Sequence, residues 1–211
     1  MIPLDTLAIF FAASVLLGLS PGPDNIFVLT QSALRGPMAG LLVTIGLCTG
    51  LVVHTTAVAL GVAAILQAST LAFTALKLIG AAYLLYLAWQ AFRASAAGLP
   101  AQGEGGPASL DGWRLYRRGI IMNVSNPKVS IFFLAFLPQF ADPARGSIAL
   151  QMLLLGGVFI VSTLLVFGGV ALLAGSLGQR LMRSATAQRL IHRVAGTVFV
   201  ALALKLASAE R

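Results

Sequence analysis

The chain has 211 residues, of which 58% are hydrophobic and only 9% are charged, and its formal net charge is +8. Soluble domains carry about 25% charged residues, so this composition predicts a polytopic membrane protein without a large soluble domain. In such a protein a basic excess is first a topology signal, and we expect no nucleic-acid partner. The single cysteine, Cys48, excludes an internal disulfide and a dithiol relay.

The first expected helix covers about residues 4–34 and is interrupted by the segment Ser20-Pro21-Gly22-Pro23-Asp24-Asn25. Proline has no amide proton, so Pro21 and Pro23 leave carbonyls of the preceding turn, such as that of Leu17, without their helical donors. The glycine between the two prolines allows the backbone to bend. The segment therefore predicts a broken membrane helix.

Asp24 follows this break directly, and apolar residues resume at once with Ile26 and Phe27. A carboxylate at membrane depth costs several kcal/mol unless it is paired, hydrated or protonated. An inert, capped aspartate beside a proline kink is the structural alternative. Ionisable groups inside a membrane usually serve a function, so we interpret Asp24 as a site residue.

Five further helices follow the first, and all expected elements are helical, so the predicted fold is all-α with six transmembrane helices. A substantial loop at 93–118 lies between the third helix and the fourth, which is interrupted at Asn126-Pro127. About 20 apolar residues suffice for one span. The expected boundaries are Met38–Leu66, Leu71–Phe92, Gly119–Phe140, Ile148–Ala174 and Ile191–Ala207.

The chain divides into two similar halves, 1–92 and 119–211, joined by a cytoplasmic linker at 93–118. Each half opens with a proline-interrupted helix, and each closes with a basic residue, a glycine and an aromatic residue at one spacing: Lys77, Gly80 and Tyr83, then Arg193, Gly196 and Phe199. Since each half has an odd number of spans, the halves must be inverted relative to each other. Inverted repeats with matched broken helices indicate a transporter with a midplane site.

The distribution of arginines orients the helices. Arg35 and the arginines of the loops after the third and fifth helices would face the cytoplasm, whereas the loop between the fourth and fifth helices holds only Arg145. The positive-inside rule therefore places both termini outside. From Arg35 back to Asp24 is about 16 Å of helix, and from Arg118 forward to Lys128 about 15 Å, so both breaks are expected near mid-membrane.

The chain resembles the LysE/RhtB family of bacterial amino-acid exporters. The likeness rests on residues 19–25, on Asn126-Pro127-Lys128, on residues 132–140 and on residues 76–86. It implies export of amino acids or close derivatives across the bacterial inner membrane, driven by the proton-motive force. The motif positions that carry over are Pro21, Pro23, Asp24, Asn126, Pro127 and Lys128.

A zwitterion suits these charges. Lys128 would bind the substrate carboxylate, while Asp24 and carbonyls exposed at the break would bind its ammonium; Asp24 could also carry the exchanged proton. The structural alternative is a fixed Asp24–Lys128 pair that only holds the halves together. Asn25 and Asn126 would line the path with them, whereas Asn123 and Ser125 are expected to cap the broken ends.

One acid and one base favour a neutral substrate such as threonine, homoserine or leucine. An ion or metal exporter is the first alternative, but it would need several acidic, Cys or His ligands. An intramembrane enzyme is the second, and no motif supports it, so we expect no catalytic activity, cofactor or metal site. Small-residue pairs such as Gly46 and Gly50 indicate close helix packing, either within the chain or in a homo-oligomer.

Overall fold

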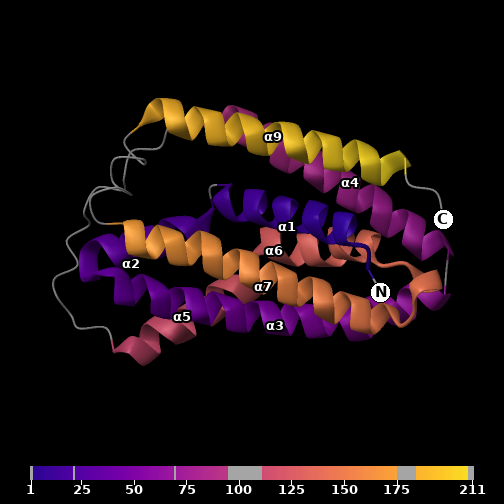
Figure 1. Cartoon of the computed structure of the whole chain (residues 1–211), viewed down its shortest axis with the longest axis horizontal. Helices are drawn as coiled ribbons and strands as arrows, with labels where there is room; N and C mark the ends of the chain where they lie inside the picture. The colour runs from indigo at the N-terminus through magenta and orange to yellow at the C-terminus, as the bar shows by residue number, and fades with distance from the viewer. Residues whose placement is uncertain (1, 21, 69, 95–110, 175–183, 209–211) are drawn as a thin grey trace.

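The computed structural model describes residues 2–20, 22–68, 70–94, 111–174 and 184–208, and every regular element in these ranges is a helix. The helices run lengthwise in one bundle (Figure 1). The first part comprises α1 Leu4–Leu19, α2 Pro23–Arg35, α3 Pro37–Ala68 and α4 Thr70–Arg93. The second part comprises α5 Gly112–Val124, α6 Pro127–Ile131, the π-helical turn η1 Phe132–Phe136, the 3-10 turns η2 Leu137–Phe140 and η3 Pro143–Arg145, then α7 Ile148–Leu173 and α9 Ala185–Ser208.

Both predicted interruptions are present. α1 and α2 meet at a bend of 63°, and α5 meets the α6–η2 segment at 50°. Pro23 and Pro127 each start the helix that follows, a position where proline's missing amide costs no hydrogen bond. Asn126 is extended and accepts the Lys128 amide through its side chain, which caps α6. Pro21 lies outside the described residues.

The long loop is shorter than the sequence predicted. The sequence places residues 112–118 in the 93–118 linker, but they form the first turns of α5. Asp111 caps the start of this helix, because its side chain accepts a hydrogen bond from the Trp113 amide. The three arginines of this turn suggested a loop, yet they lie on one exposed face while Leu115 is buried against the bundle. An amphipathic helix, rather than a linker, explains that spacing. Residues 95–110 lie outside the described residues.

Helices of each half pack against helices of the other half. The broken helix of each half packs on the second helix of the other: α1 on α7, and α5 on α3. The third helices, α4 and α9, lie side by side along one edge of the bundle (Figure 1). This packing supports the predicted inverted repeat, whose boundaries stay a prediction.

Glycines let α3 and α5 approach closely. A Cβ atom added to Gly46 would collide with the Tyr116 carbonyl oxygen, and one added to Gly119 would collide with the Val43 carbonyl oxygen. A Cβ atom on Gly50 would lie 2.7 Å from the Asn123 side chain. The small-residue pair Gly46 and Gly50 therefore serves packing within the chain, which the sequence left open.

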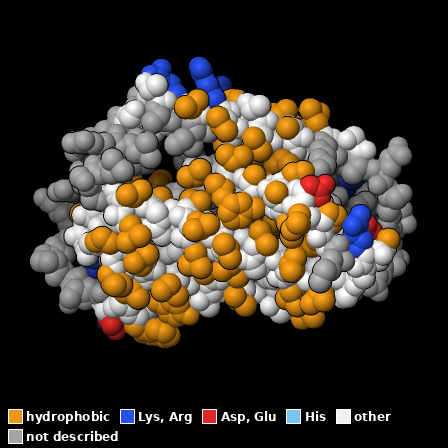
Figure 2. All heavy atoms as spheres, in the orientation of Figure 1, with side chains coloured by type: hydrophobic (Ala, Val, Ile, Leu, Met, Phe, Trp, Pro, Cys, Tyr) orange, Lys and Arg blue, Asp and Glu red, His pale blue; other side chains and the backbone are white. Residues whose placement is uncertain are grey.

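The surface of the bundle is apolar over its middle. Figure 2 shows hydrophobic side chains across the central part of one face and charged side chains toward its margins. Large apolar side chains such as Leu60, Leu150 and Leu172 are more than 60% exposed, which suits contact with lipid rather than water. The chain is a polytopic, all-helical membrane protein.

Two described helices are long and apolar enough to cross a bilayer, α3 over Pro37–Gly61 and α7, and each broken pair adds one more span if it is counted as a unit. α4 and α9 have 24 residues each, or about 36 Å of helix at about 1.5 Å per residue. That length exceeds the roughly 30 Å of hydrocarbon in a bilayer. Six spans stay a prediction.

Candidate functional site

The two helix breaks meet around one small cavity of about 30 Å³. Three parts of the chain form its wall: the α1–α2 break, the α5–α6 break and the middle of α7. The first break contributes Leu17, Gly18, Ser20, Gly22, Asp24 and Asn25, the second contributes Asn123, Asn126, Lys128 and Val129, and α7 contributes Phe159, Thr163 and Phe167. The structure thus brings the predicted acid, base and amides together from opposite halves of the chain.

Asp24 lies in the first turn of α2 and is buried. Its Oδ2 accepts a hydrogen bond from Asn126 Nδ2 at 3.0 Å, and its Oδ1 has no hydrogen-bond partner. The start of a helix carries a partial positive charge that favours a carboxylate there. One carboxylate oxygen is therefore fixed across the two breaks, while the other can still accept a hydrogen bond.

Lys128 does not form an ion pair with Asp24. Its ammonium donates instead to the carbonyls of Leu17, at 2.8 Å, and Ser20, at 2.9 Å. The break deprives this end of α1 of helical donors, and a cation at a helix C-terminus is favoured by the helix dipole. The structural alternative of a fixed Asp24–Lys128 pair is therefore wrong in this conformation, because the open carbonyls and the Asn126 amide bind the two charges separately.

The two asparagines of the breaks also bind backbone. Asn25 donates through Nδ2 to the carbonyls of Gly18, at 2.6 Å, and Ser20, at 3.0 Å. Together, Asn25 and Lys128 donate four hydrogen bonds to three carbonyls, those of Leu17 and Gly18 in the last turn of α1 and that of Ser20 just after it. Asn126 accepts the Lys128 amide through Oδ1 while its Nδ2 donates to Asp24. Asparagine, which both donates and accepts, suits each of these positions.

Of the two expected capping residues, only Ser125 behaves as predicted. Its hydroxyl donates to the Ile121 carbonyl at 2.7 Å, a local bond within α5. Asn123 is instead 2% exposed on the cavity wall, and its Oδ1 has no hydrogen-bond partner. Its carbonyl oxygen is 3.1 Å from His54 Nε2, so that histidine supports the second break from α3.

α7 supplies the part of the cavity that sequence reasoning missed. Phe159, Thr163 and Phe167 recur every four residues and so line one face of this helix. A threonine in a largely apolar helix is a weak signal, because Ser and Thr often bond their own backbone there. The four-residue spacing with two aromatics was the available clue.

Comparison with known proteins identifies the family. A model of the LysE type translocator family matches residues 15–210, a range that contains both breaks and α7. The chain belongs to the LysE type translocator family. No solved structure matches it.

Two relatives of this LysE-type translocator match it nearly end to end, and a third matches over about two thirds of its length. An uncharacterised membrane protein of Vibrio cholerae is 32% identical over 95% of this chain and 96% of its own length. The homoserine/homoserine lactone efflux protein of Salmonella typhimurium is 34% identical, with 95% of each chain covered. A leucine efflux protein of Salmonella choleraesuis is 28% identical over 63% of this chain and 62% of its own length.

Proposed function

We propose that this translocator exports amino acids, or close derivatives of them, from the bacterial cytoplasm in exchange for protons. The observation that carries the proposal is the meeting of an ammonium, a carboxylate and open backbone carbonyls around one cavity between the two helix breaks. A zwitterion presents the complementary groups. The efflux relatives, named for homoserine, its lactone and leucine, support the same class of substrate.

Recognition proceeds by exchange of partners. Lys128 now occupies the carbonyls of Leu17 and Ser20, which are the natural acceptors for a substrate ammonium. When a zwitterion binds, its ammonium donates hydrogen bonds to these carbonyls and to Asp24 Oδ1. Lys128 then donates to the substrate carboxylate instead. The charges of the one acid and the one base in the site cancel. The substrate that fits is therefore a neutral amino acid of the homoserine, threonine or leucine type.

Access to the site must alternate. A cavity of about 30 Å³ holds about one water molecule and no amino acid. One lining residue, Phe159, belongs to a cluster of six packed phenylalanines, in which neighbouring ring centroids are 4.6–6.5 Å apart. The members of this phenylalanine cluster are Phe10, Phe132, Phe133, Phe136, Phe140 and Phe159. Two of them, Phe132 and Phe136, bound the π-helical turn η1, a structure often found at functional sites.

Asp24 carries the exchanged proton in this scheme. It is the buried carboxylate of the cavity, and Asn126 donates a hydrogen bond to it. Protonation removes its charge and weakens its hold on a substrate ammonium, so proton arrival from outside would promote release there. The reverse step, proton loss to the cytoplasm, restores the binding site.

The charges at the ends of the bundle support an orientation with both termini outside. Arg35 ends α2 and Arg93 ends α4, while Asp5 and the ion pair of Asp142 with Arg145 lie at the opposite ends of the helices. With the arginine-rich ends in the cytoplasm, both termini face outside, and the phenylalanine cluster is the outer gate. This orientation makes release, rather than uptake, the step that the gate controls.

The test is counterflow in proteoliposomes. Vesicles loaded with homoserine, threonine, leucine, lysine or a sodium salt are diluted into labelled amino acid, with and without an imposed pH gradient. We expect exchange of the neutral amino acids, several-fold faster with the gradient. Asp24→Asn should lose the gradient dependence, and Asp5→Asn, an exposed aspartate at the start of α1, should retain it. Gradient-dependent export by Asp24→Asn would eliminate this residue as the coupling group.

A further inference from the structure

A second cavity lies at the other end of α1. It has a volume of about 270 Å³ and is lined by the start of α1, the η1–η3 segment, the first turn of α7 and the last part of α9. α1 has 16 residues, or about 24 Å of helix, between this cavity and the first break. At roughly 30 Å³ per liquid water the cavity has room for an amino acid, unlike the cavity at the breaks.

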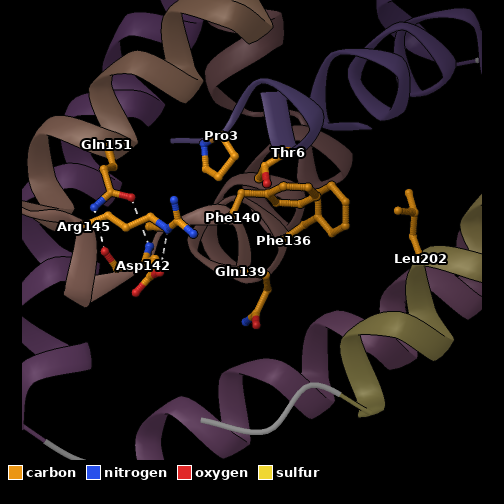
Figure 3. A pocket seen from close by; sticks show the side chains of 10 residues that line it. Pro3, Thr6, Phe136, Gln139, Phe140, Asp142, Arg145, Gln151 and Leu202 are labelled. Atoms are coloured by element: carbon orange, nitrogen blue, oxygen red, sulfur yellow. Dashed lines mark hydrogen bonds and ion pairs between the residues drawn. The ribbon is translucent and has the colours of Figure 1, made fainter. Parts of the chain in front are cut away.

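The rim of this outer cavity carries one charge of each sign. Arg145 Nε lies 2.9 Å from Asp142 Oδ2, and each side chain is about half exposed, at 49% and 47%. Figure 3 shows Arg145, Asp142 and Gln151 gathered on one side of the cavity, with Leu202 on the opposite side. An exposed ion pair is weak, because water competes for both partners, so a ligand with both charges can replace it.

The loop that bears these charges is held in place by Gln151, a buried residue of α7. Its amide donates to the Asp142 carbonyl at 2.8 Å, and its carbonyl oxygen accepts the Asp142 amide at 3.0 Å. The Ala144 amide and the Arg145 guanidinium bind the Asp142 carboxylate and lower its pKa below the usual range. Asp142 thus stays negatively charged at neutral and mildly acidic pH, and a negative charge is what binds an ammonium group.

The outer cavity adjoins the phenylalanine cluster. Phe136 and Phe140 line it, whereas Phe159 of the same cluster lines the cavity at the breaks. Members of one packed aromatic cluster therefore form part of the wall of both cavities. A molecule that passes the cluster from the breaks enters the outer cavity next.

We propose that the outer cavity is a second amino-acid site, in which a zwitterion binds through Arg145 and Asp142 after it has passed the phenylalanine cluster. The inference rests on the proposed export function for its substrate class. The substrate carboxylate contacts the Arg145 guanidinium, its ammonium contacts the Asp142 carboxylate, and its side chain lies against Phe136, Phe140 and Leu202. The site would hold the released molecule while the cluster closes behind it.

Equilibrium binding separates this site from the one at the breaks. Full-length protein in nanodiscs is titrated with labelled homoserine and leucine, and the number of bound molecules per chain is measured. We expect two in the wild type and one in Asp24→Asn, whose remaining site is the outer one. Adding Arg145→Gln to Asp24→Asn should weaken that remaining site at least about tenfold, because charge-assisted hydrogen bonds are the strong ones. Arg114→Gln, an exposed arginine of α5, is the matched control.

Each outcome decides between the two proposals. If wild-type vesicles export amino acids but Arg145→Gln leaves the binding curve of the Asp24→Asn protein unchanged, the outer site is wrong and the export function stands. If no amino acid is exported or bound by the wild type, the proposed function fails first. Leu202→Trp provides a second variant that fills the outer cavity without touching the ion pair, and we expect it to remove the same site. Acetate and methylamine, each with one of the two charges, should compete poorly.

Discussion

Asn126 Nδ2 donates to Asp24 Oδ2 at 3.0 Å, and this bond joins the two helix breaks directly. The same asparagine caps α6 through its Oδ1, so one side chain fixes both the start of a helix and the orientation of the buried carboxylate. A bond of this kind makes the two breaks one unit. Any movement that separates the halves must first release it.

Asn126→Leu tests this link. Loss of the cap costs about 0.5–2 kcal/mol, and a buried carboxylate left without its donor costs about 1–3 kcal/mol more. We expect a fall of several degrees in the melting temperature of the purified protein, together with loss of amino-acid exchange. Ser125→Ala removes only a local bond on an exposed side chain and is the control. Equal melting temperatures for the two variants would contradict the link between the breaks.

Lys128→Met removes the ammonium while keeping an unbranched side chain. The Leu17 and Ser20 carbonyls then lose a donor, at about 1–3 kcal/mol for an unsatisfied buried group, and the substrate carboxylate loses its partner. We expect the KM for exchange to rise at least about tenfold and the melting temperature to fall. Lys128→Arg, which keeps the charge, should restore part of the affinity. Lys77→Met, on α4 and outside the cavity lining, is the matched control; a similar rise in its KM would refute a specific role for Lys128.

Gly46→Ala tests the close packing of α3 on α5. The added methyl group would meet the Tyr116 carbonyl oxygen, a backbone atom that cannot turn aside. Overpacking costs about 1–3 kcal/mol, so we expect a clear drop in melting temperature. Gly157→Ala is the control, because its added methyl group meets no atom and alanine favours the helix. If both variants melt like the wild type, the contact between these helices is looser than described.

Much of the fold could be predicted because proline and glycine act locally. The breaks at residues 20–25 and 126–127 follow from missing amide protons, and the extents of α3 and α7 follow from uninterrupted apolar runs. The start of α5 was missed because its arginines resembled a loop, although the capping residue Asp111 and the buried Leu115 indicated an amphipathic helix. Local sequence features thus predicted where helices are present better than they predicted where a helix with polar end residues begins.

The arrangement within the site could not be predicted from depth alone. Opposite charges at similar depth suggested a direct pair, but Lys128 reaches the end of α1 and Asn126 reaches Asp24. Which acceptor the ammonium selects depends on the direction of each side chain after a bend, and no sequence spacing encodes that. Thr163 entered the site through the packing of α7 on α1, a contact between distant segments.

Phe136→Ala tests the outer gate. Phe136 is 3% exposed and packs against the rings of Phe10, Phe132 and Phe140. Truncation of such a residue costs about 3–5 kcal/mol in a packed core. We expect a lower melting temperature and, in sealed vesicles, a leak of amino acid whose rate no longer depends on the imposed pH gradient. Leu134→Ala lies on the same turn but is 45% exposed, so it should leave both properties unchanged. Gradient-dependent exchange without leak in Phe136→Ala would show that the cluster is no gate.

Cysteine labelling in intact cells tests the orientation. Cys48 is buried, and Cys48→Ala gives a background without a native thiol. Ala144→Cys in η3 and Met38→Cys at the start of α3 place exposed thiols at opposite ends of the bundle. With the arginine-rich ends in the cytoplasm, we expect a membrane-impermeant maleimide to label Ala144→Cys in intact cells and Met38→Cys only after the cells are opened. The reverse pattern would invert the topology and make the phenylalanine cluster the inner gate, in which case the outer cavity would receive substrate before transport instead of after it.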